Sequence, residues 1–140
     1  MAQEILKFTK LTFIIHFIIG LTFTILFWIP DIALPLYVDV TGINIAGMLV
    51  AHAMSLTIGC LFAGLTVSSL LGIFAKEWKQ VKIVAICEVV WLVANLVTSI
   101  ISFSVFIVGM AILTLVITIV LIVLFILTCL QQEDKINPIF

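Results

Sequence analysis

A single carboxylate, Glu88, lies in an apolar run from Val81 to Val97 that is otherwise almost free of charge. Helical spacing places Trp91 and Asn95 near the face of Glu88, so a polar stripe is expected along one side of this segment. A charge exposed to lipid costs about 2.5–3.5 kcal/mol even on a lenient scale, and the stripe should therefore face other helices. An acid in this position either bonds between helices or takes part in proton or ligand binding.

His16 is predicted to lie at the same depth as Glu88. It follows Lys10 by six residues, as Glu88 follows Lys82 by six, and both are therefore about 9 Å from a lysine-bearing end. His52, the other of the two histidines, falls toward the opposite end. The candidate ligand or proton site consists of four residues: Glu88, His16, Asn95 and Trp91.

Four roles fit these residues. In the first, Glu88 is protonated or hydrogen-bonded to His16 or Asn95 and fixes the register of the helices. In the second, Glu88 exchanges a proton for the cargo of a small transporter. In the third, it captures a small ligand or a lipid headgroup from the inner side. In the fourth, His16 and His52 hold haem b, although both must reach one iron while their depths differ by more than half the membrane.

Motifs of other chemistry are missing from the sequence. It has no glycine-rich phosphate loop, no HExxH or paired-carboxylate motif, and no Ser–His–acid set whose members fall at one depth. With six basic residues, all lysine, and a net charge of -1, it also lacks the basic surface of a nucleic-acid-binding protein. We therefore expect neither an enzyme nor a nucleic-acid partner, and no cofactor or metal other than the haem alternative.

The elements that must position these residues are membrane-spanning helices. The chain is 65% hydrophobic and 9% charged, against roughly 45–50% and about 25% in soluble proteins. Since one span needs roughly 20 apolar residues, 140 residues leave room for about four. We expect an all-α, polytopic membrane protein that forms one domain over residues 1–140, a compact bundle of four helices at about 11–29, 43–74, 83–103 and 105–130.

The lysines indicate how this bundle is oriented. They fall only in the N-terminal segment, in the connection between the second and third helices, and near the C-terminus. The two other connections, 30–42 and the turn at Ser102 and Ser104, carry none. Because cytoplasmic loops collect Lys and Arg, both termini are predicted on the cytoplasmic side of a multi-pass protein in the cytoplasmic or an equivalent inner membrane.

Small residues recur at every fourth position of the second helix. Such rows let two helix backbones approach closely in lipid, within the chain or with a partner. The residues expected to make these contacts are Gly47, Ala51, Ser55, Gly59 and Ala63 in one row, and Gly64, Ser68 and Gly72, with Cys60, in another.

The order of these segments resembles the DoxX-like group of small four-helix membrane proteins. The resemblance is carried by an outer connection opening "FWIPDIALPL", a helix "AGMLVAHAMSLTIGCLFAGL" and an inner loop "AKEWKQVK". It implies a compact four-helix bundle, often an accessory of redox or membrane-assembly systems. A basic residue, often Arg, commonly opens the second helix of that group, and His52 takes this position here.

The function expected from the sequence is that of an integral membrane accessory or assembly subunit that acts through helix packing. Its partners would be the lipid bilayer and other membrane protein subunits, or further copies in a homo-oligomer. The alternatives are a small proton-coupled transporter or ligand-binding membrane protein using Glu88, and a haem-binding subunit using His16 and His52.

Overall fold

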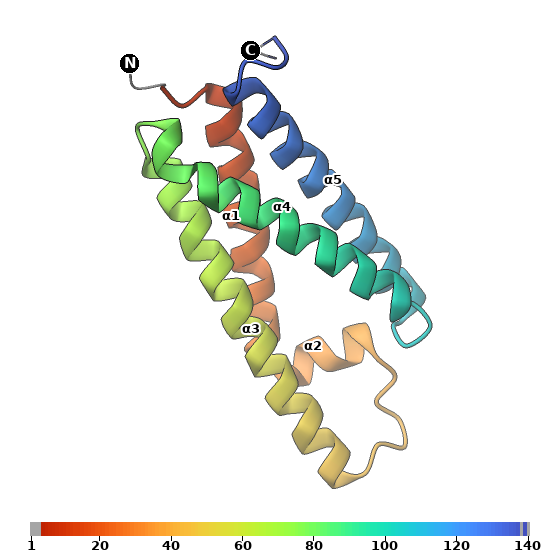
Figure 1. Ribbon diagram of the computed structural model, residues 1–140. Helices are drawn as coiled ribbons and strands as arrows, with labels where there is room; N and C mark the ends of the chain where they lie inside the picture. The colour runs from red at the N-terminus through yellow and green to blue at the C-terminus, as the bar shows by residue number, and fades with distance from the viewer. Residues whose placement is uncertain (1–3, 138, 140) are drawn as a thin grey trace.

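The computed structural model describes residues 4–137 and 139, and its regular structure is helical (Figure 1). The described residues form no β-strand, only an isolated bridge between Glu4 and Glu77. Four helices are long and apolar enough to cross a membrane, which confirms an all-α chain with four candidate spans. The five helices are α1 (Lys7–Phe27), α2 (Pro30–Tyr37), α3 (Ile45–Phe74), α4 (Trp78–Ile101) and α5 (Val108–Gln132).

Local sequence explains where the helices begin. Several helices begin at other residues than the ones predicted from hydropathy. Helix α4 begins at Trp78, not at residue 83, because Glu77 and Gln80 form a reciprocal capping box. Asn44 starts α3 by accepting a hydrogen bond of 2.8 Å from the Gly47 amide. Hydropathy excludes charged and capping residues from a span, whereas the hydrogen bonds of a helix continue through them.

Helix α2 lies in the connection 30–42 between the first two membrane-spanning helices. Pro30 occupies its first turn, where a missing amide proton costs no helical hydrogen bond. Its far end is fixed to the last connection, since the Ile107 amide donates to the Tyr37 carbonyl at 2.8 Å. The Tyr37 ring also packs against Phe27 and Phe106. This connection is therefore tied to both α1 and the α4–α5 turn.

The long helices associate in two pairs. Helix α1 packs along α3, and α4 packs along α5, whereas α3 and α4 touch little although they follow one another in the chain. Figure 1 shows α3 and α4 diverging from their short connection, and α1 meeting α5 at the end that carries both termini. The two pairs are thus joined mainly at one end of the molecule.

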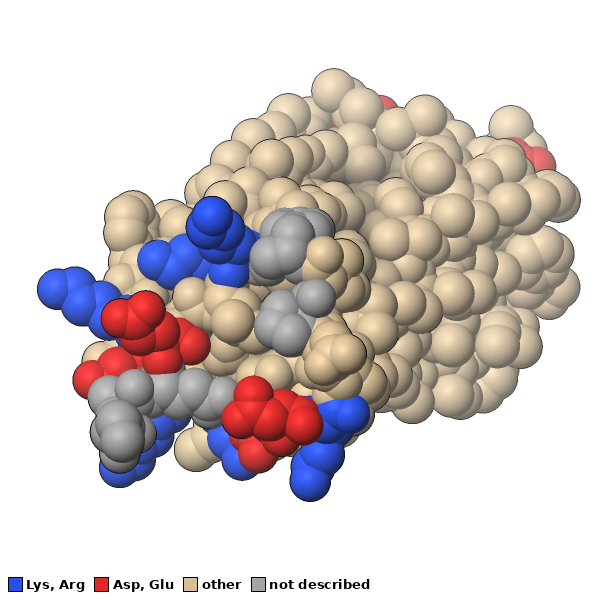
Figure 2. All heavy atoms as spheres, turned by 90° about the horizontal axis from the view of Figure 1, so that it is seen from above, with Lys and Arg blue, Asp and Glu red and all other residues tan. Residues whose placement is uncertain are grey.

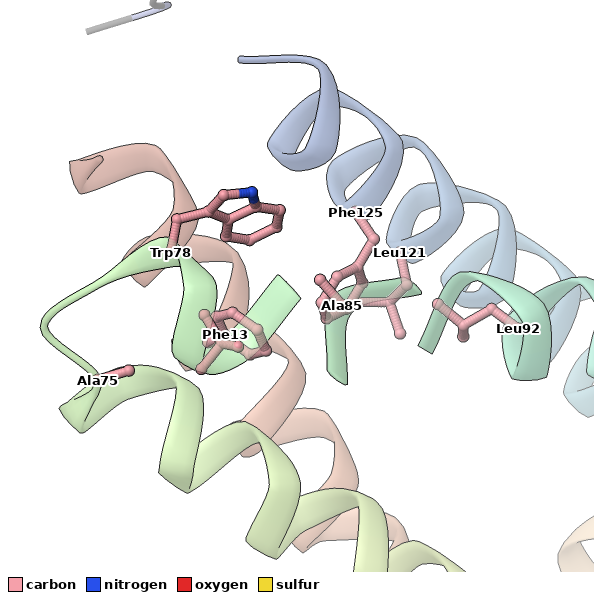
Figure 3. Packing of buried hydrophobic residues seen from close by; sticks show 8 residues of the cluster. Phe13, Ala75, Trp78, Ala85, Leu92, Leu121 and Phe125 are labelled. Carbon is pink, nitrogen blue, oxygen red and sulfur yellow. The ribbon is translucent and has the colours of Figure 1, made fainter. Parts of the chain in front are cut away.

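The buried apolar core lies at this same end. Figure 3 shows residues from α1, α4, α5 and the connection before α4 converging there. Phe13 and Phe125, both 0% exposed, meet edge to face with their ring centroids 5.4 Å apart. The cluster comprises Phe13, Ala75, Trp78, Val81, Ala85, Leu92, Leu121 and Phe125.

Charged side chains gather at the end with the termini, as the view onto that end shows (Figure 2). Lys82 Nζ lies 2.9 Å from Glu133 Oε1, which also accepts a hydrogen bond of 2.7 Å from Trp78 Nε1. The segment before α1 meets the end of α5 here as well, since Gln132 Nε2 donates to the Glu4 carbonyl at 3.4 Å. Polar contacts therefore join α4, α5 and the segment before α1 at the end of the molecule that holds the apolar core.

Candidate functional site

Four polar side chains from three helices form a cluster, here called the polar cluster: His16 of α1, Ser68 and Ser69 of α3, and Glu88 of α4. Ser68 is half-buried, and the other three are buried. His16 is 3% exposed, Ser69 0% and Glu88 2%. His16 Nδ1 lies 2.6 Å from Ser69 Oγ, and Ser68 Oγ lies 2.6 Å from Glu88 Oε1. His16 Nε2 and Glu88 Oε2 face each other at 3.7 Å.

Helix direction explains why these residues share one level. Helices α1 and α4 both run away from the lysine-bearing end, and His16 and Glu88 lie about 9 Å into them beyond Lys10 and Lys82. Helix α3 runs toward that end, so the residues two turns before its end at Phe74 come back to the same depth. Adjacent serines point in different directions on a helix, which lets one meet α1 while the other meets α4.

The hydroxyl groups have a second partner. Ser68 Oγ and Ser69 Oγ lie 2.8 Å and 3.0 Å from the carbonyl oxygen of Leu65, one turn earlier on α3. Glu88 Oε2 is buried and has no hydrogen-bond partner. The cluster therefore has one unfilled position, on the line between the carboxyl group and the imidazole.

Two further residues of the predicted site lie near Glu88 in sequence but outside the polar cluster. Asn95 Nδ2 donates to Thr118 Oγ1 of α5 at 3.1 Å, and it thus joins the α4–α5 pair. Trp91 is half-buried and meets Phe62 of α3 edge to face, with ring centroids 5.7 Å apart. The predicted polar stripe on α4 is therefore divided between different neighbours. Ser69 was not among the predicted residues, and Ser68 was predicted only as a packing residue of the second helix.

The two histidines are far apart. His16 bonds to Ser69, whereas His52 lies near the other end of α3, roughly 25 Å along the axis. His52 Nε2 instead lies 3.3 Å from Asp31 Oδ1, on the side chain of α2. Since both axial ligands of a haem must reach the same iron, this separation does not fit haem held by His16 and His52.

The expectation that no serine, histidine and acid meet at one depth is wrong, because Ser69, His16 and Glu88 do so. The set nevertheless lacks the surroundings of a hydrolase. Ser69 is fully buried, and a nucleophile needs space beside it for the substrate carbonyl and its oxyanion donors. The two described cavities lie elsewhere, one of about 210 Å³ against the outside of α4 and α5 and one of about 70 Å³ beside His52.

Some of the predicted small residues do lie where helices touch closely. Ser55 Oγ donates to the Phe27 carbonyl at 2.9 Å, and a methyl group added at Gly59 would collide with Trp28. A methyl group at Gly72 would lie 2.5 Å from the Phe13 ring. These contacts bring α3 against α1.

Other members of the two rows lie outside this contact. Gly64 is exposed, and a methyl group added there would meet nothing within 4 Å. Ala51 and Ala63 are half-buried, and Gly47 is crowded only by Ile43 and Asn44 at the start of its own helix. Residues four positions apart differ by about 40° in direction around the helix. A row of such residues therefore turns away from a neighbouring helix that runs along the axis. The buried positions on α3 follow the contact: Ser55, Gly59, Thr66, Ser69 and Gly72.

Comparison of the chain with models of protein families, with curated proteins and with solved structures finds no match. The residues and their geometry therefore carry the functional argument.

Proposed function

We propose that this protein is an integral membrane accessory or assembly subunit that acts through helix packing. The observation that carries the proposal is the outward face of α3, where Cys60 and Gly64 are exposed and a methyl group on Gly64 would meet nothing. Small residues let a second helix backbone approach in lipid, and both of these are exposed in the described structure. A helix of another subunit or of a second copy fits this face.

The sparse contact between α3 and α4 supports the same proposal. A compact four-helix bundle, as in the DoxX-like group that the sequence resembles, would be completed where such partner helices pack on the open side. Both termini and the α3–α4 connection are proposed to lie on the cytoplasmic side, because the lysines gather there.

Gly64→Leu tests the subunit proposal without touching the internal packing. The added side chain should displace a partner helix, so that the wild-type protein purifies in mild detergent as a larger assembly and the variant as the single chain. Ile119→Leu, at an exposed position of α5, is the matched control and should keep the assembly. A wild-type protein that purifies as a single chain with no bound subunit would contradict the proposal.

A second function, proton-coupled transport through Glu88, is favoured by one observation. Glu88 Oε2 is buried without a hydrogen-bond partner beside an imidazole, and intramembrane acids of this kind serve as proton relays in transporters. Reconstituted vesicles test it: pH-driven flux of cargo should be present in the wild type and absent in a well-folded Glu88→Gln protein. Equal behaviour of the two would remove transport through Glu88 from consideration.

A further inference from the structure

We infer that Glu88 and His16 are held as a neutral acid and a neutral base, and that Nε2 of His16 is a binding site for one further proton. The inference rests on the geometry of the polar cluster. It does not depend on the proposed subunit role or on transport.

The gap of 3.7 Å between His16 Nε2 and Glu88 Oε2 is the first argument. A proton on Nε2 would point along this line and form a hydrogen bond, which for a charged pair measures about 2.7–2.9 Å. Two unprotonated atoms, each presenting a lone pair, stay farther apart. The gap is too long for that hydrogen bond, and we therefore assign Nε2 as the unprotonated nitrogen of a neutral imidazole.

The remaining proton of the imidazole must then lie on Nδ1. There it donates to Ser69 Oγ at 2.6 Å, while the Ser69 hydroxyl donates to the Leu65 carbonyl at 3.0 Å. In this short chain the Ser69 hydroxyl accepts one hydrogen bond, from Nδ1, and donates one, to the carbonyl oxygen. The tautomer deduced from the gap is thus also the one that the serine requires.

Glu88 has two possible forms beside a neutral histidine. As an anion it would be buried at 2% exposure with Oε2 unpaired, and burying an ionised carboxylate without a partner costs several kcal/mol or more. As an acid, it donates from Oε1 to Ser68 Oγ at 2.6 Å, and the Ser68 hydroxyl donates to Leu65 at 2.8 Å. The second form leaves no buried charge.

One added proton fits this arrangement. It binds Nε2, and the new N–H donates to Glu88 Oε2 once the gap of 3.7 Å shortens to about 2.8 Å. No bond has to break, because Nδ1 and Oε1 keep their serine partners. Proton binding therefore draws α1 and α4 together at the one place where an imidazole and a carboxyl group face each other.

The described residues around the pair offer no competing titratable group. From α5, the apolar ring of Phe125 meets the imidazole edge to face at 5.2 Å, and from α3 the partners are the two serine hydroxyls. On α4, the nearest charge toward the lysine end, Lys82, is paired with Glu133. No other titratable side chain makes a described hydrogen bond or ion pair with His16 or Glu88, so the added proton is assigned to this pair.

The protein itself offers a clean spectroscopic test, because it has only two histidines. In a His52→Gln protein, the nitrogen NMR spectrum in bilayers reports His16 alone. At neutral pH we expect a neutral ring protonated at Nδ1, and on acidification a shift of Nε2 to the protonated position. The infrared spectrum at neutral pH should contain a protonated carboxyl band that is lost in His52→Gln/Glu88→Gln.

Several results would overturn the inference. They are a cationic His16 at neutral pH, a neutral ring protonated at Nε2, absence of a Glu88-dependent carboxylic acid band, or a His16 that stays neutral through acidification while the protein remains folded. Neither measurement involves flux or a partner subunit. Failure of this inference is therefore distinguishable from failure of the proposed function.

Discussion

Glu88 on α4 and Ser68 on α3 are joined by a hydrogen bond of 2.6 Å, across an interface where these two helices otherwise touch little. The same carboxyl group faces His16 on α1. Glu88 thus connects the α4–α5 pair to both helices of the other pair.

Two replacements of Glu88 test whether its hydrogen bonds, and not only its size, stabilise the folded protein. Glu88→Gln can still bond to Ser68 and can donate an amide proton toward His16, so its thermal unfolding in detergent should stay close to that of the wild type. Glu88→Leu removes the hydrogen bond between α4 and Ser68 and sets an apolar side chain against Nε2 of the buried imidazole, and it should lower stability by about 1–3 kcal/mol. Equal stability of the two variants would show that the hydrogen bonds of Glu88 do not hold the helix pairs together.

Replacing three glycines by alanine, one at a time, should change the stability of the protein by different amounts. Gly72→Ala drives a methyl group to 2.5 Å from the Phe13 ring, which is fully buried, and should cost about 1–3 kcal/mol. Gly59→Ala meets Trp28, whose side chain is 52% exposed and can move, so the loss should be smaller. Gly64→Ala has open space and should leave stability equal or slightly higher. Thermal unfolding measures the order, and a large loss at Gly64 would contradict the described α1–α3 contact.

The proposed orientation predicts which introduced cysteines react from each side of the membrane. With the native cysteines replaced, Gln80→Cys and Asp134→Cys should react with an impermeant reagent from the cytoplasmic side, and Asp39→Cys from the other. All three positions are exposed, unlike Gln132, which is 0% exposed and unsuitable for labelling. Reaction of Gln80→Cys and Asp39→Cys from the same side would exclude four spans with this orientation.

The contacts of Glu133 with Trp78 and Lys82 predict that the stability of the protein depends on pH. Hydrogen bonds from Trp78 and then Lys82 hold the pKa of Glu133 below its ordinary value of 4.5. A carboxyl group with a lowered pKa stabilises the folded state fully above the ordinary value, and this contribution is lost as the pH falls through the lowered pKa. The difference in melting temperature between wild type and Glu133→Gln should therefore be constant near neutral pH and shrink below about pH 4.5. A difference that persists unchanged at pH 3 would show that charge is not its cause.

Hydropathy and helical periodicity predict the long helices because both follow from near neighbours in the chain. The four spans depend only on apolar length, and the common depth of His16 and Glu88 depends only on counting from Lys10 and Lys82. These quantities need no knowledge of how the helices pack. The sequence therefore predicts that His16 and Glu88 lie at one level of the polar cluster.

The remaining members of the polar cluster depend on which helices become neighbours. Ser68 and Ser69 join the cluster because α3 returns antiparallel beside α1, and Asn95 leaves it because α5 offers Thr118 instead. Spacing along α4 cannot distinguish one neighbouring helix from another. The same reason explains why an every-fourth pattern marks α3 as a packing helix but does not separate Gly59, which meets α1, from Gly64, which does not.

The contact between Gln132 and Glu4 joins positions 128 residues apart. During synthesis, α1 and α3 can pair while the ribosome is still making the later part of the chain, but the segment at Glu4 has to wait for the end of α5. Membrane insertion of the first helices and final closure of the lysine-bearing end are therefore separate events in time. Until α5 emerges, the partly built protein exposes the apolar side of α4 to lipid or to whatever insertion machinery holds it.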